Sequence, residues 1–507
     1  MTNIEYFTSY ERQGVYTHDG SGFEGFAEFE RDWLTNRALR FYEKHTIDEV
    51  LTARRPAETH ELTMESFKKF DVPRHDIIRD EHFYKALDLT RQWGQPNRKL
   101  HPVAFPDLRY YPWNLPPNAE APWNLPKFRF KPVFRNIDGE SESPKLMEYF
   151  NRDIKMKLIY DIRGSVTITD YLKCKYKAGL IDSIRPTFHN LYNEIFIRNR
   201  FLVHEIKDGR HPFWDQHGNP VPYYFNTLHI KTTVVEANAP DKIRLVFGAP
   251  KLLLQVENMF IWPLQATYLN TGTGFLLWGR EMVRGGWKKI QRELDEIDPR
   301  LVYFGADWKS WDKRLSFELQ SEVHNIWRSY YDFTMYEPTS QYQHGSTKPE
   351  RIERLWKWMT YCILHTPIRL PDGLMARWIY SGFGSGYQQT QLMDSFGNHI
   401  VTLTCLSSMG IDIERTLKYL KVQGDDIFAA LMRFVYYLFG STFKTKFADA
   451  ADFYFGMVLD MDATFFTLKL GECSVLSYSV RHGRPYRTEV DLLRHLFFPK
   501  SGRDWAH

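Results

Sequence analysis

The pattern of hydrophobic and polar positions along this chain of 507 residues changes from helical spacing to strand spacing and back. Amphipathic runs near residues 26–42 and 80–93 predict helices, and residues 1–95 as a whole have a helical pattern. Strands are predicted from short apolar runs at 232–235, 243–246 and 301–304. Further helices are predicted at 251–269 and 287–296. The chain therefore mixes helix and sheet.

Residues 96–135 break this pattern, because the pentapeptide Pro-Trp-Asn-Leu-Pro occurs there twice, at 112–116 and 122–126. So many prolines exclude a helix and favour extended or turn backbone. A packed strap is the favoured interpretation. The alternative is that the two tryptophans guide a nucleic-acid template.

Composition narrows the class of protein. Hydrophobic residues make up 43% and charged residues 25%, as in an ordinary soluble globular protein. The net charge is only +4, so any nucleic-acid path must be local rather than spread over the surface. Four scattered cysteines suit a reducing compartment. The N-terminus lacks the pattern of a secretory signal, and the most apolar stretch, 428–439, is too short for a membrane span.

Two short acidic stretches carry the candidate chemistry. Asp307 and Asp312 follow the predicted strand 301–304, and Asp425 and Asp426 stand beside Gly424 at a predicted hairpin tip. Aspartates are also common as helix caps and in turns. Adjacent acids between buried apolar strands, however, repel one another unless a cation lies between them. Hard carboxylate oxygens suit two Mg²⁺ ions, which predicts nucleotidyl transfer.

A polar helix face lies between the two acidic stretches. Thr390, Asp394 and Asn398 follow one another at intervals of four residues, so they share one side of a predicted helix. Such a stripe can hydrogen-bond ribose hydroxyls if it faces a groove. A solvated helix face is the alternative, but Leu392 and Phe396 indicate a largely buried helix.

Three cations lie upstream in strand-like sequence, namely Lys231, Lys242 and Arg244. The last two are two residues apart, so on one strand their side chains point the same way. Such cations can neutralise a triphosphate, and an arginine adds bidentate geometry. An exposed, charged strand face is the alternative reading of the same pattern.

Taken in order, these segments resemble the motifs of viral RNA-dependent RNA polymerases, closest to those of partitiviruses, with picobirnaviruses as near relatives. The matching segments are Lys242–Gly248 for motif F, Asp307 with Asp312 for motif A, Ser385-Gly386 through Thr390 and Asp394 to Asn398 for motif B, and Gly424-Asp425-Asp426 for motif C. Further similar blocks are Pro106–Leu115, Glu257–Leu264, Leu277–Gly279 and Gly285–Trp287. The ordered series F, A, B, C is specific, and the resemblance covers roughly residues 100–500.

The resemblance implies an α+β right-hand polymerase, helix-rich, with fingers, palm and thumb around a small antiparallel palm sheet. The implied divisions are 1–95 as a helical segment bridging fingers and thumb, 96–300 as fingers with motif F at 231–248, 301–318 as palm with motif A, 319–370 as fingers and palm helices, 371–475 as palm with motifs B, C and D, and 476–507 as primer-grip region and small thumb.

The resemblance also implies roles for single residues. Asp307, Asp425 and Asp426 would bind two Mg²⁺ ions, for which Mn²⁺ can substitute. Lys469 would be the motif D lysine that protonates pyrophosphate. The expected nucleotide-binding residues are Lys231, Lys242, Arg244, Asp312, Ser385, Gly386, Thr390, Asp394 and Asn398.

Expected partners are an RNA template with its product duplex, nucleoside triphosphates and a viral capsid protein, without a membrane, in the virion interior or host cytoplasm. The sequence departs from the family pattern at Phe383-Gly384, where Val-Pro is usual. Asp394 stands where many positive-strand polymerases carry Asn, as it does in partitivirus-type enzymes.

Three alternatives remain open. A reverse transcriptase would carry a bulky aromatic residue where this chain has Asp312. A catalytically idle RNA-binding subunit would not need all three acids. A phosphodiesterase would be expected to show His-Asp metal spacing.

Overall fold

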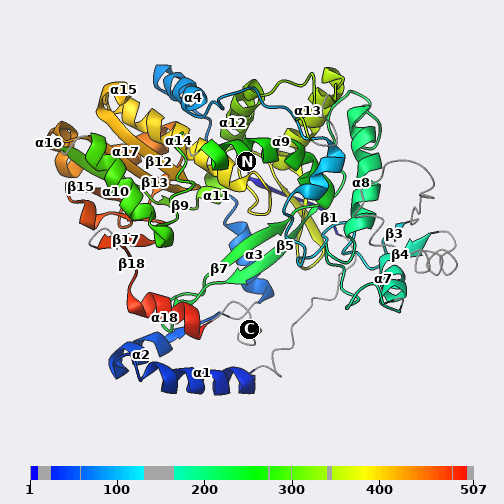
Figure 1. Ribbon diagram of the computed structural model, residues 1–507, viewed down its shortest axis with the longest axis horizontal. Helices are drawn as coiled ribbons and strands as arrows, with labels where there is room; N and C mark the ends of the chain where they lie inside the picture. The colour runs from blue at the N-terminus through cyan, green and yellow to red at the C-terminus, as the bar shows by residue number, and fades with distance from the viewer. Residues whose placement is uncertain are drawn as a thin grey trace.

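The computed structural model describes residues 2–9, 24–56, 59–130, 165–177, 179–271, 274–297, 300–339, 345–481 and 484–498 (Figure 1). Two sheets organise these residues. One is antiparallel with the strand order β12 (Leu417–Gln423), β13 (Asp426–Met432), β8 (Leu301–Gly305) and β15 (Phe465–Thr467). The other has the order β1 (Ile4–Ser9), β11 (Leu374–Trp378), β10 (Ile368–Arg369), β5 (Asn226–Thr232) and β7 (Ile243–Gly248).

The four-stranded sheet is the small antiparallel sheet that the sequence led us to expect. Strands β13 and β8 are apolar and buried nearly throughout, because helices cover this sheet. The covering helices include α14 (Thr390–Ser408) and α17 (Phe443–Phe455), which pack against each other. Helix α14 is buried over most of its length and packs in turn on α4 (Glu81–Trp93). It therefore runs through the core, against the strand β12.

The remaining elements complete the layers around the two sheets. The longer helices are α3 (His60–Lys68), α7 (Ile168–Lys177), α8 (Tyr192–Lys207), α9 (Lys251–Thr271), α10 (Gly286–Ile297), α12 (Phe317–Tyr330) and α13 (Pro349–His365). The shorter ones are α11 (Trp311–Arg314), α15 (Ile413–Thr416) and α16 (Phe434–Phe439). Small strand pairs or triplets are β14 (Val458–Leu459) with β9 (Trp308–Lys309), β3 (Arg129–Phe130) with β4 (Val166–Thr167), and β16 (Ser474–Val475), β17 (Tyr478–Arg481) and β18 (Arg484–Tyr486).

The first two helices and the last helix of the described chain meet at one end of the molecule. Helices α1 (Glu24–Ala38), α2 (Lys44–Leu51) and α18 (Glu489–Phe497) lie together there (Figure 1). They share a separate hydrophobic cluster. Strand β2 (Ala53–Arg54) pairs with β6 (Val235–Glu236), which lies in the sequence that connects β5 to β7. The N-terminal segment therefore joins the C-terminal helix to the β5–β7 hairpin.

The hairpin is tied to the N-terminal segment by two adjacent arginines. Arg54 donates to the backbone carbonyls of Ala237 and Ala239 at 3.1 and 3.0 Å and pairs with Asp241. Arg55 donates to the carbonyl of Thr232 at 2.8 Å, and its Nε donates to Phe498 at 3.0 Å. These bonds satisfy loop carbonyls that no strand partner reaches.

The proline-rich strap is packed, as the favoured interpretation predicted. Trp123 is fully buried and packs edge to face on Phe128 and Phe130. The ring of Trp113 packs on Phe188, and its indole N–H donates to the carbonyl of Leu108 at 2.7 Å. Both indole rings are thus used inside the protein. Residues 131–135, the end of the predicted strap, lie outside the described residues.

Several expected elements differ from the observed ones. The strand predicted at 232–235 is wrong in its position along the sequence, because β5 ends at Thr232 and β6 begins at Val235. Residues 1–95 are not only helical, since β1 forms an edge strand on β11. Predictions at 243–246, 301–304, 251–269 and 287–296 are confirmed. Within the described ranges, every helix is too short or too polar to cross a lipid bilayer.

Candidate active site

The acidic tip of the β12–β13 hairpin is a two-residue turn. Gln423 pairs with Asp426, which leaves Gly424 and Asp425 as the loop. Gly424 has φ +64°, whereas Asp425 is not in the left-handed region. A positive φ at the first loop position alone fits a type II′ turn, which favours glycine there. The glycine thus sharpens the hairpin so that both acids stand at its tip.

Asp307 arrives at the same edge of the sheet from the neighbouring strand. Ala429 and Ala430 of β13 pair with Phe304 and Tyr303 of β8 in antiparallel register. Continuing that register by three residues brings Asp307 level with Asp426. The acids far apart in the sequence therefore lie at one sheet edge, as the sequence analysis predicted.

Electrostatics confirms that these acids are close to one another. Burial, together with the charges of Asp425 and Asp307, raises the pKa of Asp426 to about 7. Burial also raises the pKa of Asp425, with added repulsion from Asp307 and Asp312 and a smaller opposing effect of Arg244. Crowded, desolvated carboxylates of this kind are stabilised by a bound cation.

The donor chemistry fits a divalent cation, whereas a closed ligand cage is not formed. Carboxylate oxygens are the ligands that Mg²⁺ prefers. Within the described ranges, however, no three His, Cys, Asp or Glu side chains converge as a ready metal site. One carboxylate oxygen of Asp307 accepts the backbone N–H of Trp308 at 2.9 Å. The case for a divalent cation therefore rests on the carboxylate ligands and on the repulsion between them.

Helix α14 braces both acidic segments through hydrogen bonds that sequence reasoning missed. The indole of Trp308 donates to the Asn398 side chain at 3.1 Å, and that of Trp311 donates to Asp394 at 3.0 Å. Asn398 in turn donates to the Gly424 carbonyl at 3.0 Å. The Ser395 hydroxyl accepts the Gly424 N–H at 2.8 Å. The tryptophans flanking Asp307 and Asp312 were the available signal in the sequence.

The polar stripe of α14 is accordingly used inside the protein. Asn398 is completely buried, and Asp394 is half-buried. Burial raises the pKa of Asp394 well above its usual range, although the Trp311 bond opposes this. Thr390 donates to the carbonyls of Gly384 and Tyr387 at 3.0 and 2.9 Å. Contacts from these residues to a nucleotide stay a prediction.

The loop before α14 packs directly on strand β7. A Cβ on Gly386 would overlap the carbonyl oxygen of Phe247, so only glycine fits. Ser385, beside it, is exposed. The loop with Ser385 and Gly386, which is predicted to bind the nucleotide, therefore packs against β7, the strand with the predicted triphosphate-binding residue Arg244.

A buried carboxylate of α9 caps the start of α14. Glu257 is completely buried and accepts the backbone N–H groups of Gln388 and Gln389 at 2.9 and 2.8 Å. Burial raises its pKa to about 7, and these hydrogen bonds oppose the shift. A carboxyl group at this position provides one acceptor for each of these two N–H groups at the helix start.

The three predicted cations lie on the β5–β7 hairpin. Lys231 and Arg244 face each other across the strands, and Lys242 precedes β7. All three are exposed, and none forms an ion pair with another residue in the part of the chain that the structure describes. Like charges directly opposite destabilise a sheet, so this pair suits an anionic partner. The Arg244 charge also lowers the pKa of Asp425, which places the hairpin opposite the acids.

Asp312 stands in the short helix α11, where its carbonyl accepts the N–H of Phe383 at 2.9 Å. Its carboxylate is half-exposed and pairs with Lys313 at 3.1 Å. The Ser310 backbone, with φ +61°, turns the chain between the two acids of motif A. Asp312 is therefore tied to the loop that carries Ser385.

Lys469 is not brought to the acids. Strand β15 pairs with β8 so that Phe465 is level with Gly305 and Thr467 with Tyr303. The chain thus runs away from the acidic edge before it reaches Lys469. The ammonium group is exposed and pairs with Glu472 at 3.1 Å. The predicted role of Lys469 in protonating pyrophosphate has no support in this arrangement.

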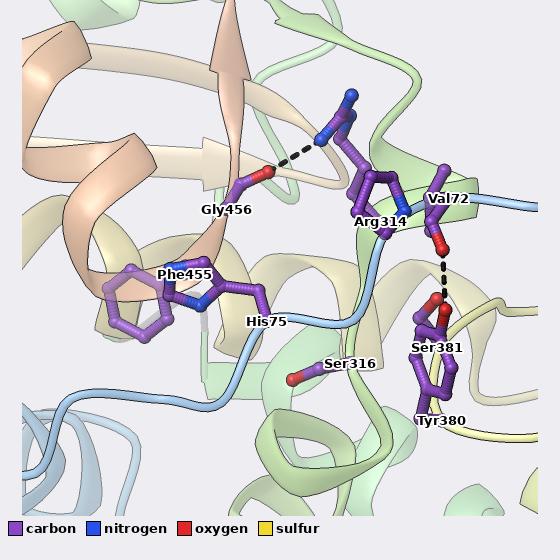
Figure 2. Close-up of a pocket in the computed structure, with 9 residues that line it drawn as sticks. Val72, His75, Arg314, Ser316, Tyr380, Ser381, Phe455 and Gly456 are labelled. Atoms are coloured by element: carbon purple, nitrogen blue, oxygen red, sulfur yellow. Dashed lines mark hydrogen bonds between the residues drawn. The ribbon is translucent and has the colours of Figure 1, made fainter. Parts of the chain in front are cut away.

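A small cavity lies behind motif A, where the N-terminal segment crosses it (Figure 2). Arg314 donates to the carbonyl of Gly456 at 2.8 Å, and Tyr380 donates to that of Val72 at 2.7 Å. His75 Nδ1 and Ser381 Oγ line it without a partner among the described residues. It has room for about one water molecule, so it is too small for a substrate.

Residues 210–491 match the family described as viral RNA-dependent RNA polymerase. This match takes in more than half of the chain, and the chain therefore belongs to that family. The RNA-directed RNA polymerase of White clover cryptic virus 1 (isolate Boccardo/2004) is 28% identical over 524 residues, covering 99% of this chain and 80% of that protein. The RNA-directed RNA polymerase of Atkinsonella hypoxylon virus (isolate 2H) is 23% identical over 435 residues, covering 78% and 58% respectively.

Proposed function

We propose that this chain replicates and transcribes a viral double-stranded RNA genome by two-metal nucleotidyl transfer at the edge formed by β8 and the β12–β13 hairpin. One observation carries the proposal: Asp307 and Asp426, from separate strands, lie level at that edge, and their charges raise the pKa of buried carboxyls there. The similarity to two RNA-directed RNA polymerases supports the same reaction.

Asp307, Asp425 and Asp426 would hold two Mg²⁺ ions, or Mn²⁺ in their place. When bound, such ions activate the attacking 3′-hydroxyl and neutralise the leaving pyrophosphate. The protein's own part is to bring the three carboxylates to one edge and to hold them there through α14. We assign no step to Lys469, because β15 carries it away from the acids.

The β5–β7 hairpin would bind the triphosphate. Lys231 and Arg244 face each other and Lys242 is adjacent, so three exposed positive charges gather on one hairpin. A phosphate chain would relieve their mutual repulsion and be oriented toward Asp425.

The ribose would be read beside motif A. Asp312 can accept a hydrogen bond from a 2′-hydroxyl, and Ser385 lies on the exposed loop tied to it. Gly386 lets that loop rest on β7. Thr390, Asp394 and Asn398 would form this wall from α14 and belong to the proposed nucleotide-binding set.

In this proposal the four-stranded sheet is the palm, and the hairpin belongs to the fingers. The contact of α1 and α2 with α18 supports a bridge from N-terminal segment to thumb. The proposed division keeps the boundaries 1–95, 96–300, 301–318, 319–370, 371–475 and 476–507. The RNA template, its product duplex and a capsid protein would be the partners, in the virion interior or host cytoplasm.

The test is metal-dependent incorporation of nucleotides on an RNA template. We expect wild-type protein to extend RNA with Mg²⁺ or Mn²⁺, and Asp425→Asn to lose roughly 10³-fold or more in kcat, as expected for loss of a charge-stabilising group. Asp295→Asn, a control on the exposed face of α10, should retain full activity. Equal activity of Asp425→Asn and wild type, or activity without a divalent ion, would overturn the proposal.

A further inference from the structure

The proline-rich strap places one strained, buried acid at the base of the β5–β7 hairpin. Glu120 lies between the two Pro-Trp-Asn-Leu-Pro repeats and has φ +59°. A left-handed backbone is costly for a side chain of this type and persists only where the surroundings fix it. Glu120 is nevertheless almost fully buried. Its position is therefore dictated by what its carboxylate contacts.

The carboxylate of Glu120 reaches both strands of the hairpin. Its Oε1 pairs with Nε2 of His229, on β5, at 2.9 Å. On β7 it fills the place where Gly248 would carry a Cβ, so any larger residue at 248 would overlap it. Asn124, four residues along the strap, donates to the Thr227 hydroxyl at 3.2 Å. Glu120 and Asn124, in one turn of the strap, thus contact both β5 and β7.

Glu120 favours the charged form of its partner His229. Burial lowers the pKa of His229, but the hydrogen bond and charge of Glu120 more than compensate, so the pKa is raised overall. Lys251, at the start of α9, opposes this shift by lowering the pKa of His229. A buried carboxylate with a charged partner costs far less than one left unpaired.

We infer that Glu120 is a positioning residue for nucleotide binding, which sets the β5–β7 hairpin through His229 and Gly248 and thereby aims Lys231 and Arg244 at the triphosphate. The inference rests on the proposed function, because it takes the hairpin as the triphosphate site. The same strands lead to Phe247, on whose carbonyl Gly386 of the nucleotide loop rests. A shift of the strands beside Glu120 therefore moves both the cations Lys231 and Arg244 and the loop that carries Gly386.

The sharpest variant is Glu120→Gly. Glycine accepts a left-handed φ without strain, so the variant relieves the backbone strain at this position while it loses the contacts to the hairpin. We expect KM for nucleoside triphosphates to rise about tenfold with kcat changed much less, as for a lost binding interaction that includes a charged hydrogen bond. Backbone amides of β5 and β7 should exchange hydrogen faster.

Two further variants separate positioning from general loss of structure. Ser477→Gly relaxes another left-handed residue, with φ +62°, in the β16–β17 turn and should leave KM and exchange unchanged. Glu120→Gln keeps the size of the side chain but removes its charge. Combined with His229→Gln, it should raise KM no more than either change alone, since both break one pair.

The outcomes distinguish this inference from the proposed function. Unchanged KM and unchanged amide exchange in Glu120→Gly, or additive effects of the two glutamine variants, would overturn the role of Glu120. Arg244→Ala serves as the independent test of the hairpin. If Arg244→Ala leaves KM unaltered while Glu120→Gly still loosens the hairpin, the triphosphate assignment fails and only the structural grip of Glu120 survives.

Discussion

Trp308 donates its indole N–H to the side-chain oxygen of Asn398 at 3.1 Å, deep in the protein. Through this bond the residue that follows Asp307 is fastened to helix α14. The amide of the same asparagine donates to the carbonyl of Gly424, beside Asp425. One side chain therefore couples motif A to motif C. Rigid support of this kind keeps reactive groups in place for the proposed reaction.

Trp308→Phe removes the donor of this bond and leaves most of the ring. Among the described residues, the Asn398 oxygen then keeps only a distant contact with Thr402 at 3.5 Å. We expect a loss of about 1–3 kcal/mol in the free energy of unfolding, as for a buried polar group left unpaired. Because Asp307 loses its anchor, kcat should fall as well. Denaturant unfolding and primer extension measure the two effects.

Trp327→Phe is the matched control. Trp327 is completely buried, and its indole N–H has no partner among the described residues. The same truncation there removes an unsatisfied donor and should cost less stability than Trp308→Phe. Equal losses in the two variants would show that the Trp308 bond contributes nothing beyond ring packing.

Gly386→Ala tests the contact between the nucleotide loop and β7. The added methyl group would overlap the Phe247 carbonyl, which is backbone and cannot rotate away. Overpacking of this kind costs about 1–3 kcal/mol, so we expect a lower melting temperature and a higher KM for nucleotides. Gly471→Ala, where nothing lies within 4 Å of the new methyl group, is the control. A Gly386→Ala protein with wild-type KM and stability would contradict the packing described above.

Much of the acidic site was predictable because it depends on local pattern. Asp307 follows an apolar strand, and Gly424 marks a tight turn before two acids. These signals place the acids at strand ends, and the family resemblance supplied the order of the motifs. Even so, the sequence did not reveal the antiparallel register between β13 and β8, which is set by long-range packing.

The supporting residues were beyond sequence reasoning for a physical reason. Glu257 and Glu120 act across large sequence separations, and their types carry no periodic signal. Trp308 stands beside Asp307 in the sequence, but nothing there identifies Asn398 as its partner. The register of β15 does not support the role predicted for Lys469, because a lysine after a strand has no sequence signature of which sheet edge it reaches. Asn398 was placed on the correct helix face, but its burial depends on Trp308 and Gly424, which only the fold brings together.

Glu257 makes the stability of the protein depend on pH. Its pKa is raised to about 7 from an ordinary 4.5, so the folded state holds a proton that the unfolded state releases between these values. The contribution of Glu257 to the free energy of unfolding is therefore greatest below pH 4.5 and is lost as pH rises toward 7. The loss is on the order of 3 kcal/mol for one group.

The measurement compares wild type with Glu257→Gln by denaturant unfolding from pH 4.5 to 8. Other buried acids contribute to both proteins and cancel in the difference. We expect wild type to lose stability relative to Glu257→Gln as pH rises. A difference that stays constant across this range, or grows in favour of wild type, would show that Glu257 is ionised at low pH in the folded protein.

Asp312→Ala tests how the proposed site distinguishes ribose from deoxyribose. The half-exposed carboxylate of Asp312 is held by Lys313 and is free to accept a 2′-hydroxyl. A deoxynucleotide leaves that acceptor unsatisfied, whereas the alanine variant has no acceptor to leave unpaired. We expect the preference in kcat/KM for ribonucleotides to fall about ten- to hundredfold, mainly through weaker use of the ribonucleotide. Asp312→Asn keeps an oxygen acceptor in the same place and should retain part of the preference. Identical discrimination by wild type and Asp312→Ala, measured with paired nucleotide and deoxynucleotide substrates, would remove Asp312 from sugar selection.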